Sequence, residues 1–436
     1  MLLILALVFL AAAWLFNMGI LVYAVYALIA IFFVSHLFAS GWVSSLKASR
    51  SINQLVAKVG DTIPIAIKVK NEGRFPISWV LVEDMLSKRD RSDKGKRIQV
   101  TGRHMEVTDF KPGGQLQMMY QVKCNQRGYY QIGPLVAETG DLFGLNRRYR
   151  VLQQPAYLLV QPEVVLLEGY DIASRRPIGE IVMTHRLFED PTRIAGVRRY
   201  ESGDALSRIH WRATARTGNL QSKIYEPSTV AGATILLDFH KKSFDRKNEP
   251  MRSELAITCA ASIANAVQQM RQQVGLVSNG RDAADRIREE GWRGDRRTRD
   301  EALKSASMDN KNERLRPVIV PTQRADDQIV HVLQTLARLE KTDGLSFFEM
   351  IGEAQQRLPR DASIIAILTH VDLEVGVALG ELRRQGYAVT AIINCFEIER
   401  FSHLSATLLA EGIETRHLLD KASIRSICER QVLLAR

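Results

Sequence analysis

Cysteine is scarce, and the cysteines present form no pattern that carries structure or chemistry. The four stand far apart in the 436-residue chain, without Cys-x-x-Cys spacing, at Cys124, Cys259, Cys395 and Cys428. A disulfide-stapled domain and a zinc module both need cysteines at short, repeated spacings. Neither is indicated, and this cysteine usage agrees with a reducing compartment.

Charge is missing from the first part of the chain. His36 is the one side chain between Met1 and Phe38 that can carry a charge near neutral pH, whereas charged residues occur throughout from Lys47 onward. A single membrane-crossing helix needs about 20 apolar residues. Residues 1–40 are nearly twice that length and are therefore predicted to lie in a bilayer.

The middle of this apolar segment predicts a turn. Asn17, Met18 and Gly19 interrupt it, which favours a transmembrane helical hairpin with two short spans, Met1–Phe16 and Ile20–Phe38. One signal anchor followed by an interfacial segment is the alternative, because the first span is short.

Positive charge sets the expected orientation. Lys47 and Arg50 follow the second span closely, and such residues favour the cytoplasmic side of a membrane. The expected localisation is therefore the inner (cytoplasmic) membrane, with a multi-pass anchor and cytoplasmic domains. The net charge of +11 suggests an anionic partner, for which membrane lipid is the simplest candidate.

Residues 51–165 alternate between apolar and polar side chains. Ile63, Ile65, Ile67 and Val69 form one such run, and turn residues such as Pro112-Gly-Gly114 separate it from the next. Short alternating strands with frequent turns are typical of an antiparallel β-sandwich. No catalytic cluster stands out in this domain.

Residues 231–436 alternate between strand and helix patterns. Apolar stripes at helical spacing, such as Leu255, Cys259 and Ile263, lie between short apolar runs. The predicted strands are 234–238, 275–278, 363–369 and 387–394. This alternation predicts a doubly wound α/β domain, in which helices cover both faces of a parallel sheet. A run of mixed charge at 281–316 is predicted to be a solvated insertion.

Residues 166–230 are rich in arginine and are predicted to connect the two domains. They hold a dense constellation made of Arg198, Tyr200, Gly203, Asp204, Arg208, Trp211, Ala215 and Arg216. In these positions the chain resembles the family called domain of unknown function 58. That family's signature is an arginine, an aromatic, a Gly-Asp pair and Arg-x-x-Trp-x-x-x-Ala-Arg. Arg127-Gly-Tyr-Tyr and Asp141-Leu-Phe-Gly-Leu145 add to the resemblance.

The resemblance implies a fold and a partner. Such proteins join paired N-terminal spans and a sandwich to an α/β domain similar to von Willebrand factor A modules. They look like partners of MoxR-type AAA+ ATPases in membrane-associated systems that assemble or activate other proteins, and no catalytic activity is attached to them. We therefore expect a non-enzymatic, membrane-tethered adaptor without a cofactor. Its α/β domain would bind the ATPase or a client at the carboxyl ends of the strands.

The signature residues have two interpretations of their own. Asp204 stands four residues before Arg208, and Trp211 offers an apolar face on which an arginine can stack. Such a network would lock the sandwich against the α/β domain. Alternatively, exposed Arg198, Tyr200 and Arg216 would form a docking surface for an acidic partner.

Two other functions remain open as alternatives. A metal-independent hydrolase would use Ser207 as nucleophile, His210 as base and Asp204 to orient the imidazole, but no Gly-x-Ser-x-Gly elbow accompanies them. The arginine-rich segment could instead bind an anionic surface or nucleic acid. No nucleic-acid fold signature supports that interpretation, so nucleic acid is not the expected partner.

The sequence matches only part of a known magnesium-binding motif. Von Willebrand factor A modules hold Mg²⁺ through Asp-x-Ser-x-Ser and later oxygen ligands; here Asp238 is followed by His240 and Lys242 at the serine positions. Asp372 matches the late acid. Mg²⁺ requires oxygen ligands, and a lysine ammonium repels it. No tight binding is expected, and Asp238 and Asp372 are predicted to cap the helices that follow their strands.

Overall fold

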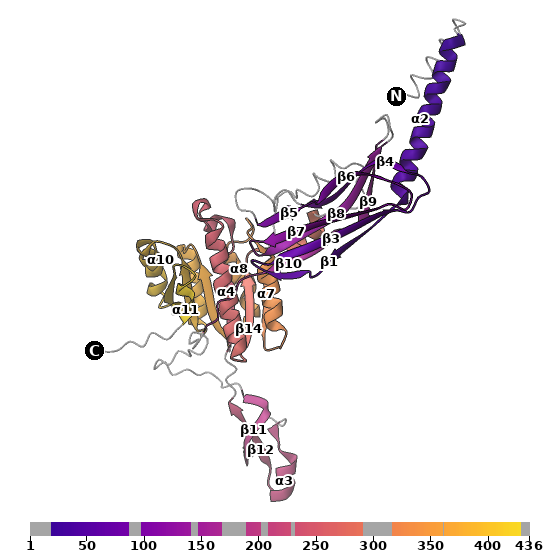
Figure 1. Cartoon of the computed structure of the whole chain (residues 1–436). Coiled ribbons are helices and arrows are strands. Elements are labelled where there is room, and N and C mark those ends of the chain that lie inside the picture. The colour runs from indigo at the N-terminus through magenta and orange to yellow at the C-terminus, as the bar shows by residue number, and fades with distance from the viewer. Residues whose placement is uncertain are drawn as a thin grey trace. The chain divides into compact units, whose positions relative to one another are not determined.

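The computed structural model describes eight stretches of the chain. They are residues 19–86, 97–140, 147–167, 189–201, 208–227, 232–290, 316–360 and 362–428. The chain divides into two compact units, each discontinuous in sequence. Unit 1 consists of Met1–Glu163, Gly280–Arg314 and Leu333–Gly344, and unit 2 of Val164–Asn279, Leu315–Val332 and Leu345–Arg436. Figure 1 labels their elements along the chain.

The first described element is the helix α2, Gly19–Ser45. Among the described residues, no helix is both long enough and apolar enough to cross a membrane. The transmembrane hairpin predicted over residues 1–40, and the inner-membrane localisation drawn from it, are therefore wrong. Residues 1–18, which hold the first predicted span, lie outside the described stretches.

The last turn of α2 belongs to unit 1. Trp42 and Val43 are buried, and Trp42 is part of the core of that unit. Arg150 Nη1 donates hydrogen bonds to the carbonyl oxygens of Val43 (3.0 Å) and Ser44 (2.8 Å). The apolar residues at the end of this helix are therefore explained by packing against strands.

Unit 1 is built from two sheets. One has the strand order β1-β3-β7-β5, and the other β2-β10-β8-β4-β6 with β9 paired to β8. All pairs are antiparallel except β2 with β10. The strands are β1 (Leu46–Ile52), β2 (Val56–Lys58), β3 (Thr62–Asn71), β4 (Ile77–Leu86), β5 (Ile98–Gly102), β6 (Met105–Phe110), β7 (Gln115–Cys124), β8 (Gly128–Gly140), β9 (Arg147–Gln153) and β10 (Ala156–Gln161).

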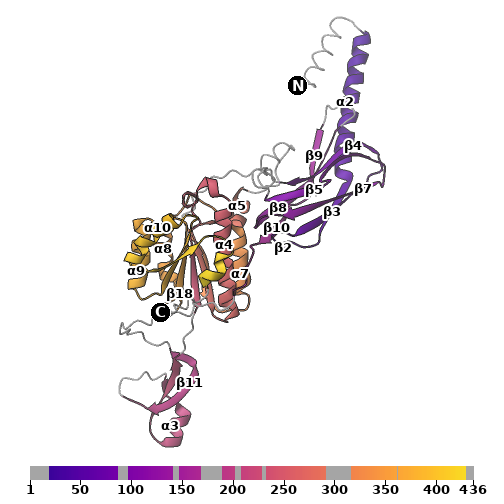
Figure 2. The ribbon, with the colours of Figure 1, turned by 60° about the vertical axis from the view of Figure 1, so that its left-hand side comes forward.

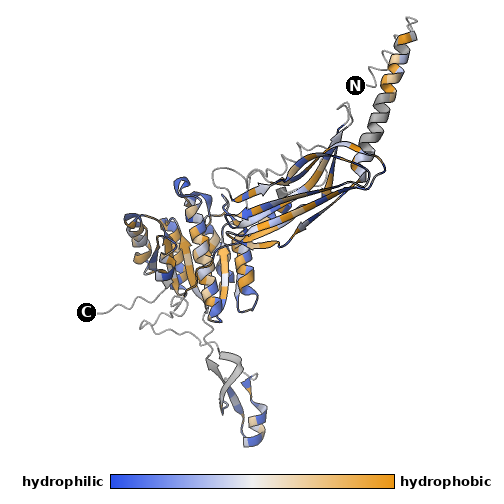
Figure 3. Cartoon of the chain, viewed as in Figure 1, coloured by the Kyte–Doolittle hydropathy of each residue, from blue (hydrophilic) through white to orange (hydrophobic). Residues whose placement is uncertain are grey.

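One core joins the two sheets. Ile63, Ile65, Ile67 and Val69 alternate along β3 and are all buried, and they share a cluster with Val80 of β4 in the other sheet. Figure 3 shows apolar residues running through these strands. Full burial of one such aliphatic side chain stabilises a fold by roughly 1.5–3 kcal/mol. The period of two therefore specifies which face of β3 points into the sandwich.

Unit 1 also includes part of the predicted charged insertion. Residues 281–290 form β15 (Arg281–Asp282) and α5 (Ala283–Glu290), and β15 pairs with β17 (Leu339–Glu340). Arg281 and Arg286 are buried, and Arg286 Nε lies 2.7 Å from Glu340 Oε2. This part of 281–316 is ordered and packed rather than solvated. Residues 291–315 lie outside the described part.

Unit 2 contains a six-stranded sheet of order β16-β14-β13-β18-β19-β20, in which only β16 is antiparallel to its neighbour. The strands are β13 (Gly232–Leu237), β14 (Gln273–Ser278), β16 (Val318–Gln323), β18 (Ser363–Leu368), β19 (Val389–Asn394) and β20 (Glu414–Leu418). The helices are α4 (Met251–Gln269), α7 (Gln328–Arg338, whose last part belongs to unit 1), α8 (Phe347–Ala354), α9 (Leu373–Arg384), α10 (Ile398–Ala410) and α11 (Ser423–Cys428), with 3₁₀ turns η3 (Lys241–Ser243), η4 (Arg246–Asn248) and η5 (Gln355–Arg357).

The connections of this sheet create a ligand-binding geometry. Every residue of β13 and β14 is buried, as in a sheet with helices on both faces, which Figure 2 shows. The chain leaves β13 toward β14 and β16, then returns to β18 on the other side of β13. The carboxyl ends of strands at such a reversal open a crevice in which α/β proteins bind ligands.

Candidate functional site

The arginine-rich signature forms a small substructure in unit 2. β11 (Glu189–Arg199) and β12 (Gln221–Pro227) pair antiparallel, and α3 (Trp211–Thr217) lies between them in sequence. Trp211, Ala215 and Arg216 are exposed, Trp211 to 69%. The network of arginines and Trp211 that would lock the sandwich against the α/β domain stays a prediction.

The rest of the signature is only partly described. Arg198 forms an ion pair with Glu201, with 3.6 Å between Nη1 and Oε2. Tyr200 and Arg208 are half-buried. Gly203, Asp204 and Ser207 lie outside the described residues, so the expected Asp204–Arg208 pairing stays a prediction.

His210 has a structural task at the start of α3. Its Nδ1 accepts a hydrogen bond of 3.0 Å from the backbone N–H of Ala213, which caps the helix. This bond fixes the orientation of the ring. Of the three residues of the hydrolase interpretation, His210 alone is described, and that interpretation also stays a prediction.

The two candidate metal ligands are used in other ways. No group of three His, Cys, Asp or Glu side chains in the described stretches could hold a metal ion. Asp238 Oδ1 accepts hydrogen bonds from Asn279 Nδ2 (3.0 Å) and from the backbone N–H of His240 (3.1 Å). Asp372 stands at the N-cap position of α9 without a capping bond and lies 2.7 Å from His370 Nε2. The prediction that both acids cap helices is therefore wrong.

Replacing Asp238 by asparagine should change how stability depends on pH. Burial raises the pKa of Asp238, and hydrogen bonds from Ser243, Asn279 and His240 act against it. A carboxyl with a raised folded-state pKa stabilises the fold below its unfolded pKa, and this contribution is lost as pH rises through the folded pKa. Asparagine keeps the Oδ1 acceptor and does not titrate. The free energy of unfolding of the variant minus that of the wild type should therefore grow as pH rises above about 4. Urea denaturation at a series of pH values measures this; a constant difference would contradict it.

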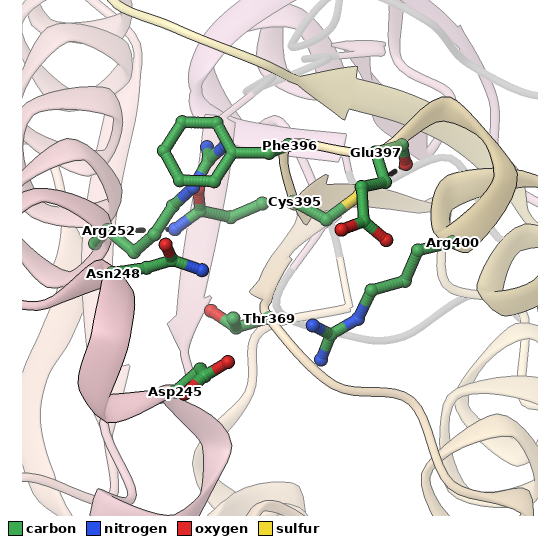
Figure 4. Close-up of a pocket in the computed structure, with 9 residues that line it drawn as sticks. Asp245, Asn248, Arg252, Thr369, Cys395, Phe396, Glu397 and Arg400 are labelled. Atoms are coloured by element: carbon green, nitrogen blue, oxygen red, sulfur yellow. Dashed lines mark hydrogen bonds between the residues drawn. The ribbon is translucent and has the colours of Figure 1, made fainter.

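A cavity of about 110 Å³ lies at the carboxyl edge of the sheet in unit 2 (Figure 4). Its lining comes from the connection after β13, the start of α4, the end of β18, the end of β19 and the start of α10. The lining residues are Asp245, Asn248, Arg252, Thr369, Asn394, Cys395, Phe396, Glu397 and Arg400. Pockets for drug-sized ligands measure roughly 300–1,000 Å³. This cavity therefore suits a group of side-chain size.

Arg252 is the buried cation of this cavity, with 3% of its surface exposed. Its Nη1 donates to Asn394 Oδ1 (2.9 Å) and to the carbonyl oxygens of Leu418 (3.2 Å) and Leu419 (2.9 Å). The ring of Phe396 covers the guanidinium, with 3.2 Å from Cζ to the ring centroid. Nη2 is buried and has no hydrogen-bond partner among the described residues. Burial lowers the pKa of Arg252, but a guanidinium stays charged in proteins.

Cys395 lies beside a histidine at the edge of the cavity. Its Sγ lies 3.5 Å from His417 Nε2, which also lies 2.8 Å from the carbonyl oxygen of Cys395. Burial raises the pKa of the Cys395 thiol, and Arg252 and Arg400 act against it. The thiolate is the reactive form of cysteine, and a raised pKa lowers the fraction of thiolate at neutral pH.

Large apolar side chains are exposed around the same edge. They are Phe348, Leu373, Phe396, Ile398 and Leu419, with Leu373 and Ile398 exposed to 76% and 71%. Four of them follow the parallel strands β18, β19 and β20, whose carboxyl ends share one edge. Phe348 is the second residue of α8 and lies three residues after Leu345, whose carbonyl accepts from Asn279 just beyond the end of β14. Grouped exposed apolar residues mark interaction sites.

The sequence interpretation gave none of the cavity residues a functional role, although one signal was present. Arg252 continues the apolar stripe of Leu255, Cys259 and Ile263 one turn toward the start of α4. A charge on the buried face of a helix needs partners in the interior. The partners that it finds, Asn394 and the end of β20, could not be identified without the strand order.

Fold and site together define an α/β domain with a cationic cavity at its carboxyl edge, joined in one chain to a β-sandwich. Residues 196–298, which include β12, β13 and α4, match the model of the family described as Protein of unknown function DUF58. The chain is also 23% identical over 240 residues to the uncharacterized protein YeaD of Bacillus subtilis (strain 168), covering 55% of this chain and 57% of that protein. It thus spans little more than half the length of this curated relative.

Solved structures give only faint similarity. The CARDB domain of a Pyrococcus furiosus protein is 15% identical, with 26% of this chain and 91% of that chain covered and a TM-score of 0.17. The PapD-like domain 7 of human CEP192 is 13% identical, with 26% and 84% covered and a TM-score of 0.18. TM-scores this low carry no argument about function.

Proposed function

We propose that this is a non-enzymatic interaction protein that binds a partner protein at the carboxyl edge of the sheet in unit 2. The five exposed apolar side chains around that edge, beside the Arg252 cavity, are the observation that carries the proposal. A partner that covers such exposed apolar side chains removes them from water, and this stabilises the complex.

The partner in this proposal is a MoxR-type AAA+ ATPase or a client of that ATPase. The resemblance of the signature residues to the DUF58 family supports this choice, and the family match over residues 196–298 agrees with that resemblance. We also propose that unit 2 is related to von Willebrand factor A modules. Its parallel strands with one antiparallel edge strand, β16, support that relation. The sandwich would then transmit partner binding to the rest of the chain.

The arginine-rich hairpin is a second candidate surface. Trp211, Arg212 and Arg216 are exposed together on the short helix α3, and the chain carries a net charge of +11. An anionic partner bound there would be lost with Trp211→Ala and would be retained by variants at the edge of the sheet. The two surfaces are therefore separable by experiment.

Ile398→Asp is expected to weaken capture of the purified ATPase by the full chain by roughly 30-fold or more. Truncating a central residue of an interface commonly costs about 2 kcal/mol or more, and a charge at an apolar contact adds a desolvation cost. Ile398 is the first residue of α10 and is strongly exposed, so its replacement should leave the fold intact. Pull-down with and without nucleotide measures the effect.

Leu409→Asp is the matched control. Leu409 is also exposed and lies near the other end of the same helix, so this variant should capture the ATPase as well as the wild type does. Equal losses in both variants would argue against an interface at the carboxyl edge. Failure of the wild-type chain to retain the ATPase in either nucleotide state would reject this partner.

A further inference from the structure

We propose that the Arg252 cavity binds the side-chain carboxylate of an acidic residue in the partner protein. This inference rests on the proposed function, because it assigns the chemistry of one contact within the same partner site. The partner segment would carry one acidic residue next to apolar residues, which would cover Leu373, Phe396 and Ile398.

The first argument is that Arg252 is buried without an ion pair in the described part of the chain, although the charge of Asp420 acts on it. In the described stretches no ion pair joins Arg252 to an acid, and its nearest polar partners are one amide and two carbonyl oxygens, all on Nη1. Burial of a charge is costly unless that charge is paired. A carboxylate on Nη2 would supply both the missing hydrogen-bond acceptor and a negative charge in direct contact with the guanidinium.

The second argument is the direction of approach. Phe396 covers the face of the guanidinium, and Nη1 is already used. The edge that carries Nη2 is the part left for an acceptor, and planar acceptors bind guanidinium groups edge-on. Phe396 is itself 38% exposed, so solvent and ligands can reach the ring that covers the guanidinium.

The third argument comes from α10. Its N-cap residue, Glu397, makes no side-chain capping bond, and the start of a helix leaves unsatisfied N–H groups with partial positive charge. Glu397 and Arg400, from the cap and first turn of this helix, both line the cavity. A carboxylate there would have the helix start on one side and Arg252 on the other.

Size and charge select a carboxylate over a larger or more highly charged group. The cavity volume of about 110 Å³ is too small for a nucleotide or other cofactor. Asp245 and Glu397 also line it, and both carboxylates repel an incoming anion. Repulsion is stronger for doubly charged phosphate than for a singly charged carboxylate.

The test is a titration of the full chain, labelled with ¹⁵N in arginine, with N-acetylglutamic acid α-amide. This probe carries a side-chain carboxylate as its one charge. We expect a saturable shift of the Arg252 side-chain resonance, identified by its absence from Arg252→Lys. Arg400→Gln should weaken binding roughly 3- to 10-fold, as expected for loss of about 1 kcal/mol. Arg246→Gln should leave binding unchanged, because Arg246 is exposed on the same edge outside the cavity.

Four other outcomes would overturn the inference. They are an equal shift with the neutral N-acetylglutamine α-amide, tighter binding of N-acetylalanine (a chain-terminal carboxylate), tighter binding of inorganic phosphate, and no shift beyond that caused by matched chloride. If the probe fails while Ile398→Asp still weakens ATPase capture, the carboxylate site is rejected and the proposed function stands. If the probe binds while no ATPase is captured, the site stands and the partner is rejected.

Discussion

Asp84→Asn is expected to lower the free energy of unfolding of unit 1 by about 3–5 kcal/mol, because it leaves a buried cation unpaired. Asp84 Oδ1 accepts from Arg50 Nη2, and the side chains are 0% and 3% exposed. Tyr120 Oη donates to Asp84 Oδ2 at 2.6 Å. Burial and the Asp84 charge raise the pKa of Tyr120, so its hydroxyl remains a donor. Hydrogen exchange of the β3 and β7 amides measures the opening free energy of this unit.

A surface ion pair provides the matched comparison. Lys47 Nζ lies 2.6 Å from Glu72 Oε2, but both side chains are exposed, so Glu72→Gln should have a far smaller effect. Combining Asp84→Leu with Arg50→Met and Tyr120→Phe should recover much of the loss, since apolar replacement of a whole buried network is often tolerated. If Asp84→Asn lowered the free energy of unfolding as little as Glu72→Gln does, the network of Arg50, Asp84 and Tyr120 would not stabilise unit 1 as described.

Arg127→Met is expected to destabilise unit 1 by about 2–3 kcal/mol, the effect of removing hydrogen bonds that involve a charged donor. Arg127 is buried, and its Nη1 donates to the carbonyl oxygens of Leu336 (2.9 Å), Ala337 (3.3 Å) and Leu339 (2.8 Å). These carbonyls lie at and just beyond the end of α7, where no intrahelical donor remains. The guanidinium also opposes the negative end of the helix dipole.

Loss of the Arg127 hydrogen bonds should be seen most directly as a fall in the hydrogen-exchange protection of the backbone amides of residues 333–344. Arg127→Lys retains the positive charge on a shorter side chain, so it should lose less protection than Arg127→Met. Arg103→Met, which removes an exposed arginine that pairs with Glu106 in the same unit, should leave the protection of residues 333–344 unchanged. Equal protection in wild type and Arg127→Met would show that the three carbonyls do not depend on this side chain.

Local pattern was enough to predict individual strands. The alternation of Ile63, Ile65 and Ile67 predicted a half-buried strand, and these side chains are buried along β3. The apolar run 234–238 likewise predicted a buried strand, and β13 covers Gly232–Leu237. Such predictions succeed because the apolar residues that bury one or both faces of a strand follow one another closely in the sequence.

Features that depend on contacts between distant residues could not be predicted. The hydrophobicity of the first forty residues predicted a hairpin in lipid, but it did not show that Trp42 packs in the core of unit 1. Arg127 was noted only as part of a family resemblance, because its acceptors lie more than two hundred residues away. The cavity combines residues from three connections, β13 to α4, β18 to α9 and β19 to α10, so its composition follows from the strand order and not from any single segment.

The interleaving of the two units has a consequence for synthesis and cleavage. Unit 1 takes Gly280–Arg314 and Leu333–Gly344 from within the sequence of unit 2, so no single peptide-bond break releases either unit whole. On the ribosome, the sandwich strands emerge long before Leu336 and Leu339 supply the acceptors that Arg127 bonds. Unit 1 can therefore reach its final state only after Leu333–Gly344 has been translated.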